Sequence, residues 1–539
     1  MKTVKPRLNS LIFFLILSFI FIISCDNKLN KKNTERYFTT NLESEPETLD
    51  PQLIKDVSGY VLADKLYEGL VRLDENSEII PAGAESWTVS EDGKIWTFSI
   101  RKGTKWSNGD TVTAYDYARG MKRGLEPETA AAYSFIMYYI QGAKEYNTGE
   151  LKDFNKVGIK VKDDYTLEIT LAKPVAYFGK TLITPIYLPV NEKVINKNKE
   201  KYGTEAEMAV YNGPYILTKW KHEDRMVLEK NPDYWNEKEI KSKKINLIMI
   251  ADMDVSAKLF ENKEVNFTRI SLEKIREFKG KPELKPYPDG RVWYLALNTK
   301  NPVFKNKNIR KAMILAINRE ELVNNVLDGV GIKASGLVAK GIPGVEKDFR
   351  EENGDLYAQY KDADLKTIFE TGLKESGLTK ENVKLTLTVD ERGTGRKEAE
   401  FYQEQWKKKL GLEVKVDVVT YKEMITRATE GNFDILRNSW GPDYVDAMTY
   451  LEIFMTNSGL NTAKYSNPEY DKLVNFAQES INAKLRIKAM ENAEKILIND
   501  FVYSGLYFQV GTYLQSTDVE DLIIRAAGNS IDFYKVYLK

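Results

Sequence analysis

The chain has 539 residues, of which 42% are hydrophobic, so two or three folded domains are expected rather than a single core. Its 79 basic and 79 acidic residues give a formal net charge of zero, which argues against a nucleic acid or an acidic membrane surface as the main partner. One histidine, His222, and one cysteine, Cys25, exclude a histidine metal cluster, a disulfide framework and a CxxC site within the chain, so no metal or cofactor is expected.

The first 24 residues have the pattern of an export signal. Lys2, Lys5 and Arg7 give a positive start, and residues 11–23 are apolar except for Ser18. A helix needs about 20 residues to cross a bilayer. The apolar run is shorter than that, so we expect this signal peptide to be cleaved rather than to remain as a membrane span.

A lipid attachment site follows the apolar run. Residues 22–25 (IISC) resemble the bacterial lipobox, in which the cysteine becomes the lipidated first residue of the mature protein. The alternative is a plain signal peptide with a chance cysteine, but Cys25 is the only cysteine and stands where lipobox chemistry needs it. Several acyl chains, palmitate among them, would anchor the lipoprotein to the cell membrane on its extracytoplasmic (periplasmic) side. Residues 26–36 are rich in Lys and Asn and are expected to form a flexible tether.

The first part of the folded chain is rich in strand and turn signals. Residues 85–100 contain two strand patterns around a turn signal at 90–93, which predicts a hairpin. A helix is expected over 114–124 and a second hairpin over 158–171. We interpret this block as a small α+β domain inserted after Tyr67.

His222 lies in a polar run, residues 220–224, that resembles the tip of a hairpin. A Ser-His or Cys-His catalytic pair would have to use this histidine. A surface position is the simpler interpretation, and the chain has no HExxH motif. The sequence therefore does not predict a peptidase, although a peptidase would also bind extended peptides.

The second half of the chain alternates helices with strands. Residues 384–389 and 412–419 are predicted strands on either side of an amphipathic helix, residues 396–410, that ends at Gly411. This β-α-β unit should have a right-handed crossover and parallel strands. A second helix is expected over 421–430.

Near the C-terminus, six apolar side chains recur at helical spacing. They are Leu485, Ala489, Met490, Ala493, Ile496 and Leu497. This pattern predicts a helix with one face on the core rather than a cofactor site.

A cation, a large ring and an anion follow a short apolar strand, residues 433–436. Arg437, Trp440 and Asp443 would then lie just beyond the carboxyl end of the strand, where open α/β sheets bind ligands. The acid end of a small zwitterion could pair with Arg437, its body could lie on Trp440, and its ammonium could meet Asp443. A free peptide is the commonest molecule of that description. The alternative is a sheet-edge loop with an exposed ion pair.

The sequence as a whole closely resembles the oligopeptide-binding proteins, the substrate-binding components of bacterial oligopeptide ABC transporters. The matching stretches keep the order of that family and span nearly the whole mature chain. They are residues 45–51, 66–70, 84–87, 96–98, 105–109, 212–215, 229–235 and 309–312, Trp440 with 443–444, and Tyr465 with 470–471. Each stretch alone is weak evidence for the family, but together the stretches are specific to it.

The resemblance implies a mixed α/β periplasmic-binding-protein fold with three domains in two lobes that are joined by hinge strands. Lobe I would comprise residues 37–67, 193–288 and 509–539, lobe II residues 289–508, and the inserted domain residues 68–192, after a signal peptide at 1–24 and a lipidated tether at 25–36. The two lobes would close on an extended peptide. The protein would be a monomer without enzymatic activity that delivers short peptides to the transmembrane subunits of an ABC permease.

The resemblance also carries over individual residues. Asp443 resembles the anchor for the peptide's α-ammonium, and Trp440 and Arg437 resemble its neighbours, with Arg437 as a partner for the carboxylate of short peptides. The further pocket residues are Tyr133 from the smaller lobe, Tyr287, Tyr421, Tyr507 and, through its backbone, Val57. Two departures stand out: the histidines that some relatives use for longer peptides are missing, and Asp446-Ala447 stands where relatives often have Asp-Pro.

Two other functions share this sequence pattern. The same clamp could be tuned to a different cargo, such as nickel, haem or an oligosaccharide, but the combination of Arg437, Trp440 and Asp443 favours a zwitterion. A surface adhesin that has kept the clamp fold is the second alternative.

Overall fold

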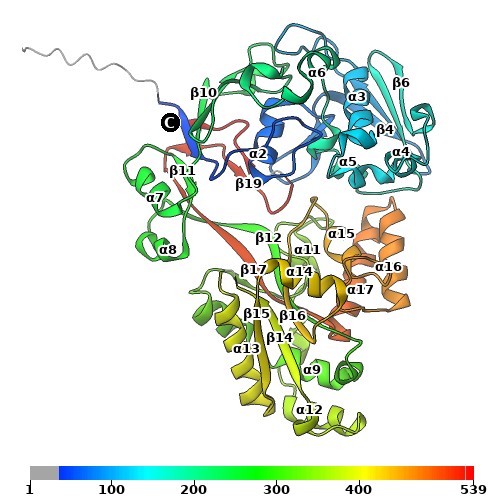
Figure 1. The fold of residues 1–539 in the computed structure, drawn as a ribbon, viewed down its shortest axis with the longest axis vertical. Helices are drawn as coiled ribbons and strands as arrows, with labels where there is room; N and C mark the ends of the chain where they lie inside the picture. The colour runs from blue at the N-terminus through cyan, green and yellow to red at the C-terminus, as the bar shows by residue number, and fades with distance from the viewer. Residues whose placement is uncertain (1–35, 392, 529) are drawn as a thin grey trace, which may run out of the picture. The chain divides into compact units, whose positions relative to one another are not determined.

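The computed structural model describes residues 36–391, 393–528 and 530–539 (Figure 1). The predicted signal peptide, Cys25 and the tether up to residue 35 lie outside the described residues. Phe38–Lys539 forms one compact unit, and the fold described below is the fold of that unit.

A mixed sheet of 11 strands runs through the unit. The long strands β12 (Leu284–Leu297) and β17 (Tyr503–Gln515) are paired at its centre and run from the upper to the lower part of the ribbon in Figure 1. On one side of this pair the order is β16 (Ile435–Trp440), β14 (Leu385–Asp390) and β15 (Val414–Val419), and β13 (Ile332–Lys333) also pairs with β17. On the other side the order is β11 (Phe267–Arg269), β1 (Phe38–Asn41), β10 (Lys244–Ile248), β9 (Arg225–Lys230) and β8 (Tyr215–Lys221).

The predicted β-α-β unit is confirmed. β14 and β15 are parallel and in register from Leu385 opposite Val414, and α13 (Gly395–Leu410) connects them. Gly411 ends α13 with φ of 67°, a left-handed conformation that favours glycine. The next helix, α14 (Tyr421–Glu430), has the bounds that the sequence predicts.

The predicted place of Arg437 and Trp440 beyond a strand is wrong. β16 continues through both residues, because residues 435–440 pair antiparallel with β12. The apolar run ends at Leu436, but a strand ends where its hydrogen bonds end, and β12 offers partners as far as Val292 opposite Trp440. Asp443 lies past the end of β16, as predicted.

The smaller predicted elements also form. A separate four-stranded sheet has the order β4 (Ala84–Val89), β5 (Ile95–Ile100), β7 (Thr166–Thr170) and β6 (Ile159–Asp163), so both predicted hairpins are confirmed. The helix α3 (Ala114–Leu125) follows Thr113, whose backbone N–H donates to Asp116 at 2.7 Å.

The remaining helices and strands complete the unit. They are α2 (Val57–Leu66), α4 (Ala143–Asn147), α5 (Phe178–Thr181), α6 (Glu192–Asn198), α7 (Met253–Glu261), α8 (Leu272–Phe278), α9 (Lys307–Leu315), α10 (Arg319–Glu321), α11 (Phe349–Asn353), α12 (Leu365–Glu375), α15 (Met448–Leu451), α16 (Pro468–Glu479), α17 (Ala483–Asp500), β2 (Val71–Leu73), β3 (Ile79–Pro81), β18 (Val519–Glu520), β19 (Ile523–Ile524), β20 (Ile531–Asp532) and β21 (Tyr537–Leu538).

The predicted apolar stripe of α17 is only partly buried. Ala489, Met490, Ala493 and Leu497 are buried, whereas Leu485 is 55% exposed. Helical spacing places Leu485 on the same face as the others, but a stripe is buried only along the length over which another element packs on it.

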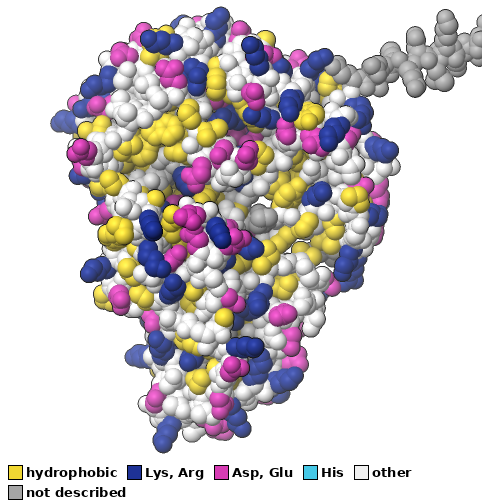
Figure 2. Space-filling model, turned by 180° about the vertical axis from the view of Figure 1, so that it is seen from behind, with side chains coloured by type: hydrophobic (Ala, Val, Ile, Leu, Met, Phe, Trp, Pro, Cys, Tyr) yellow, Lys and Arg dark blue, Asp and Glu magenta, His cyan; other side chains and the backbone are white. Residues whose placement is uncertain are grey.

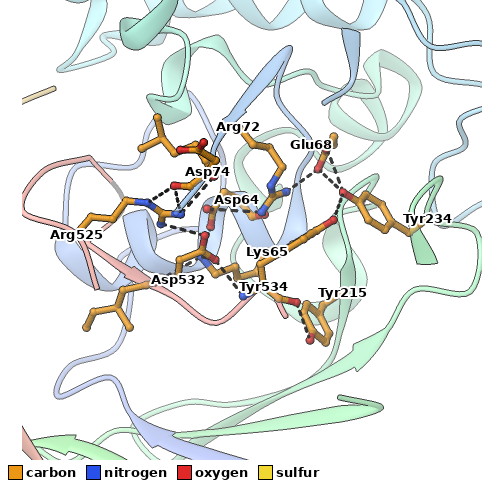
Figure 3. Close-up of polar contacts among 12 residues, drawn as sticks. Asp64, Lys65, Glu68, Arg72, Asp74, Tyr215, Tyr234, Arg525, Asp532 and Tyr534 are labelled. Carbon is orange, nitrogen blue, oxygen red and sulfur yellow. Dashed lines mark hydrogen bonds and ion pairs between the residues drawn. The ribbon is translucent and has the colours of Figure 1, made fainter. Parts of the chain in front are cut away.

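A buried ionic cluster joins α2 to the C-terminal segment of the chain (Figure 3). Lys65 is fully buried, and its ammonium lies 3.1 Å from Asp532 and 2.5 Å from Asp64. Arg525 pairs with Asp532 at 3.0 Å. Beside them, Arg72 pairs with Glu68 at 2.7 Å. Since charges out of water are tolerated only when they are paired, these contacts fix the last residues of the chain against α2.

We expect Asp532→Asn to destabilise the protein at pH 7 by about 3–5 kcal/mol, because Lys65 and Arg525 would lose a buried partner. Burial alone would raise the pKa of Asp532, but the charges of Lys65, Arg525 and Arg72 together hold it well below its usual range. The stabilisation from this carboxylate is therefore fully present above about pH 4 and is lost as the pH falls further.

Urea unfolding at pH 7, 5 and 3.5 measures this effect. The stability difference between Asp532→Asn and the wild type should stay constant down to about pH 4 and shrink below it. Asp521→Asn, in an exposed ion pair with Lys241, serves as the control and should cost less than about 1 kcal/mol. A difference that grows in acid would contradict the prediction.

Candidate functional site

The candidate site lies where β12, β16 and β17 meet the loop after β16. A cavity of about 610 Å³ opens there. Its lining includes Arg291, Trp293, Asp390, Tyr421, Arg437, Trp440, Asp443, Tyr507 and Gln509. The structure therefore brings five of the eight predicted binding residues, from two strands, one helix and one loop, to the same cavity.

Thr449 in α15 fixes the loop that carries Asp443. Its hydroxyl oxygen accepts hydrogen bonds from the backbone N–H of Asp443 at 3.3 Å and from the indole N–H of Trp440 at 3.4 Å. The ring of Trp440 and the backbone of Asp443 are thus held by one hydroxyl group.

The carboxylate of Asp443 is available to a ligand. Its side chain is exposed in the cavity, and no described residue donates a hydrogen bond to it. Partial removal of water by the surrounding protein raises the pKa of Asp443, and the nearby Arg291 opposes that shift. The negative charge of Asp443 in turn adds to the raised pKa values of Tyr60 and Tyr133, so it faces these two tyrosines. This arrangement suits a cation that arrives with its own hydrogen-bond donors.

Arg437 is buried and already has a counter-ion. Two of its nitrogens donate to the carboxylate of Glu398 at 2.7 and 2.6 Å, and its guanidinium lies 3.7 Å above the ring of Trp293. Tyr507 donates to the same carboxylate at 3.0 Å. The third nitrogen, Nη1, has no hydrogen-bond partner among the described residues and lies 3.6 Å from Asp390. Its predicted pairing with a ligand carboxylate stays a prediction.

A second cavity, of about 340 Å³, holds two more of the predicted residues. Val57, the first residue of α2, is 76% exposed at its edge, and Tyr287 of β12 donates to Gln515 at 2.6 Å. Glu43, Arg269, Asp289 and Tyr513 also line this cavity. The sequence does not predict that the candidate binding residues divide between two cavities, which are lined by different stretches of the same two long strands.

A bulge in β12 directs neighbouring charges to different cavities. The pairing of β12 with β17 shifts register between residues 288 and 292. Gly290, at φ of 73°, occupies the bulge, where a Cβ would lie 2.1 Å from the carbonyl oxygen of Ala526. As a result Asp289 lines the smaller cavity and Arg291 the larger one.

The remaining predicted residues lie at the margins. Tyr421, the first residue of α14, is 44% exposed and lines the larger cavity. Tyr133 lines neither cavity and packs edge to face on Tyr60 of α2, with ring centroids 5.8 Å apart. Figure 2 shows a hollow across the middle of one face of the molecule, bordered by hydrophobic side chains and by several Asp and Glu side chains.

Sequence reasoning missed Glu398 and Arg291. Glu398 lies on the same face of α13 as the buried Tyr402 and Gln405, so its helical spacing signalled burial. Arg291 and Asp289 lie in the middle of a long strand, and such charges in a central strand usually face a partner or a cavity.

A buried acid lies near Asp443, between α5 and α15. Glu452 accepts hydrogen bonds from Tyr444 at 2.6 Å and from Gln478 at 3.4 Å. Tyr177, which precedes α5, stacks on Tyr444 with ring centroids 5.0 Å apart and planes inclined by 3°. Burial raises the pKa of Glu452 to about 7, against the effect of the hydrogen bonds from Tyr444 and Gln478.

The raised pKa of Glu452 predicts a pH dependence of stability. The folded protein keeps a proton on this carboxyl up to about pH 7, whereas the unfolded chain releases it near pH 4.3. Folded stability should therefore fall by up to about 3 kcal/mol as the pH rises from about 4.5 to 7, and the fall should stop above pH 7. Glu452→Gln should remove this part of the pH dependence, while the exposed Glu469→Gln should not. Urea unfolding between pH 5 and 8 checks both variants, and equal slopes in all three proteins would contradict the assignment.

His222 lies in the turn between β8 and β9, as predicted. Its ring nitrogens face Glu45 at 2.6 Å and Glu205 at 3.2 Å, and these hydrogen bonds raise the pKa of His222. Among the described residues, no group of three or more His, Cys, Asp or Glu side chains could hold a metal ion. Within the same described ranges, no helix combines the length and hydropathy of a membrane span.

Comparison with known proteins shows the family of the chain. Residues 78–462 match the family model "Bacterial extracellular solute-binding proteins, family 5 Middle". The chain is 33% identical to "Dipeptide-binding protein DppE" of Bacillus subtilis, over 92% of this chain and 91% of the relative. It is 34% identical to "Oligopeptide-binding protein OppA" of the same organism, over 98% of both chains.

Solved structures agree with the fold. A structure of Listeria monocytogenes OppA bound to peptide covers 93% of this chain and 99% of its own, with 31% identity and a TM-score of 0.69. The unliganded open form of the murein tripeptide-binding protein MppA covers 93% of this chain and 97% of its own, with 25% identity and a TM-score of 0.82. The predicted mixed α/β periplasmic-binding-protein fold is confirmed. The chain therefore belongs to family 5 of the bacterial extracellular solute-binding proteins, which are receptors and not enzymes.

Proposed function

We propose that this protein is an extracytoplasmic lipoprotein that captures short peptides and delivers them to an ABC permease. The observation that carries the proposal is the carboxylate of Asp443, which lines a cavity of about 610 Å³ without a hydrogen-bond donor from any described residue. A peptide's α-ammonium would bring both the charge and the donors that this carboxylate lacks.

The names of the relatives support a peptide as the ligand. Several curated relatives are called dipeptide-binding or oligopeptide-binding proteins, and one solved structure holds the peptide RPPGFSPFR. One relative with 28% identity is called a probable deoxycholate-binding protein, so a family relationship alone does not select the cargo. The zwitterion-binding chemistry at Asp443 favours a peptide over a bile acid, which has no ammonium.

We further propose the three-domain clamp with the boundaries that the sequence suggests, in which β12 and β17 include the hinge. The candidate residues divide between two cavities that share these two strands, as an open clamp would require. The structure is more similar to the unliganded open form of MppA, at 25% identity, than to peptide-bound OppA of Listeria monocytogenes, at 31% identity. A better superposition despite lower identity supports an open arrangement of the two lobes.

Backbone recognition explains how such a clamp accepts many peptides. Every peptide presents the same main-chain donors and acceptors, and bridging water in a roomy cavity replaces direct side-chain contacts at little cost. Tyr133, Tyr421, Trp440, Tyr507 and the backbone of Val57 would line the closed cleft. Closure follows only if the ligand contacts both lobes, because a ligand shifts an equilibrium by its difference in affinity for the two states.

Anchoring through Cys25 and delivery to a permease complete the proposal. The lipobox supports a lipid anchor on the extracytoplasmic side of the cell membrane, and short peptides released there would meet the transmembrane subunits of the transporter. Mass spectrometry of membrane-extracted protein should find acyl chains on an N-terminal Cys25. A mature chain that begins at another residue would contradict this part of the proposal.

Native mass spectrometry of the purified protein tests the peptide ligand. We expect retained masses that fragment into short peptides, and small-angle scattering should show compaction when peptide is added. A retained cargo that is not a peptide, or absence of binding to a mixture of peptides of two to six residues, would overturn the proposal.

A further inference from the structure

A bound peptide has an ammonium at one end and a carboxylate at the other, and each needs a partner of the opposite charge. The inference below, which concerns the carboxylate, rests on the proposed function. Asp443 would hold the ammonium, which leaves the C-terminal carboxylate to be placed. Four arginines line the two cavities: Arg269, Arg291, Arg437 and Arg525. The hydrogen bonds that each arginine already makes decide which of them is available.

Two of the four arginines are buried and already paired with a carboxylate, and a third is placed beside the ammonium site. Arg437 is paired with Glu398 through two hydrogen bonds. Arg525 is buried, pairs with Asp532 and donates to backbone carbonyl oxygens of Leu73 and Asp74. Arg291 donates to Ser439 at 3.1 Å, and its charge acts directly on Asp443.

Arg269 is the arginine that remains available. It ends β11 opposite Tyr513, and its side chain is 39% exposed in the smaller cavity. No described residue accepts a hydrogen bond from its guanidinium; the nearest carboxylate oxygen, on Glu43, lies 3.7 Å away. A guanidinium has five donors arranged for bidentate binding of a carboxylate, so this group has unused capacity.

The position of Arg269 fits the far end of a short extended peptide. Gln509 lines the larger cavity and Tyr513 the smaller one, and these residues are four apart on β17, about 13 Å at a rise of roughly 3.3 Å per residue. An extended peptide covers about 3.3–3.6 Å per residue, so a ligand of about three to five residues reaches from one cavity to the other. The aromatic wall of Tyr287 and Tyr513 would cover the last side chain.

We propose that Arg269 receives the C-terminal carboxylate of the bound peptide and that Glu43 is the internal counter-ion that this carboxylate displaces. Glu43 is held loosely, at a distance beyond hydrogen bonding. Burial raises the pKa of Glu43, which makes it easier for this side chain to leave the pair by taking up a proton or turning to water.

The other acid of this cavity has partners of its own. Asp289 accepts hydrogen bonds from the side chain of Gln509 at 2.6 Å and from the backbone N–H of Arg291 at 3.0 Å. Its pKa is raised by burial, and Arg291 and Arg269 both oppose that shift. Asp289 therefore keeps its hydrogen bonds when a carboxylate arrives, and Glu43 is the group that exchanges.

Amidation of the peptide's C-terminus and the substitution Arg269→Gln, made separately and together, test whether Arg269 binds the C-terminal carboxylate. Isothermal titration calorimetry measures the affinity of a tetrapeptide with a free or an amidated C-terminus for the wild type and for Arg269→Gln. In the wild type, amidation should weaken binding about tenfold or more, since it removes a charge-assisted pair. In Arg269→Gln the free acid should bind about as weakly as the amide. Arg276→Gln, in an exposed ion pair with Asp328, should behave as the wild type.

Glu43→Gln should change the affinity for the free-acid tetrapeptide in the opposite direction to Arg269→Gln. Removal of the internal competitor should tighten the free-acid tetrapeptide several-fold and leave the amide unchanged. If the cavity instead receives a basic side chain, Glu43→Gln will weaken lysine-containing peptides, and the proposal is wrong. An equal penalty for amidation in the wild type and in Arg269→Gln also overturns it. Failure of the wild type to bind any peptide would overturn the proposed function instead, so the two failures are distinguishable.

Discussion

Replacing Asp443 by asparagine is expected to weaken the binding of a free tripeptide at least tenfold at pH 7. A charge-assisted hydrogen bond contributes about 1.5–3 kcal/mol, and a factor of ten in affinity corresponds to about 1.4 kcal/mol. Asparagine keeps the size of the side chain and loses its charge, so the loop that Thr449 fixes should persist. Calorimetry with the purified protein measures the effect.

N-acetylation of the peptide should mimic this substitution. The acetylated peptide has lost the ammonium, so the wild type and Asp443→Asn should bind it with similar affinity. Asp362→Asn, an exposed aspartate far from both cavities in sequence, is the matched control and should bind as the wild type does. Unchanged affinity in Asp443→Asn would remove this residue from the site.

Removal of Glu398 should destabilise the protein by about 3–5 kcal/mol. Arg437 is 1% exposed and would lose the carboxylate to which it donates two hydrogen bonds, keeping only the more distant Asp390 at 3.6 Å. Tyr507 and Tyr402 would also lose the carboxylate to which they donate, at 3.0 and 2.7 Å. Urea unfolding of Glu398→Ala measures the loss of stability.

Two further variants separate the loss of the buried ion pair from the effect on stability of changing any residue of α13. Glu400→Ala changes an exposed glutamate on the same helix and should alter stability by less than about 0.5 kcal/mol. The double variant with Glu398→Leu and Arg437→Met removes both charges, and it should recover much of the stability that Glu398→Ala loses. Equal effects of Glu398→Ala and Glu400→Ala would show that the ion pair does not stabilise the fold.

Local signals in the sequence are strongest where one element forms without help from distant residues. The helix over 421–430 and the stop of α13 at Gly411 follow from side-chain periodicity and from the left-handed conformation that glycine adopts easily. The hairpin of β4 and β5 follows from a turn signal between two strand patterns. Such features depend on neighbours within a few residues.

The extent of β16 shows where local signals end. Arg437 and Trp440 are polar or bulky residues after an apolar run, and they belong to the strand only because β12 pairs with them. The burial of Leu485 was also predicted wrongly, because helical spacing gives the face of a side chain and not the length over which another element packs on that face. For β16 the deciding partner is remote in the sequence.

The sequence by itself determined the kinds of element, the absence of histidine and cysteine chemistry outside His222 and Cys25, and Asp443 as a candidate anchor. Only the tertiary structure decided how the charges pair. Glu398, 39 residues before Arg437, takes up two nitrogens of that guanidinium, whereas Arg269 keeps its donors free of any described acceptor. The physical reason is that the strength and availability of a charge depend on distances of a few ångströms between side chains, which are set when strands and helices pack and not by their order along the chain.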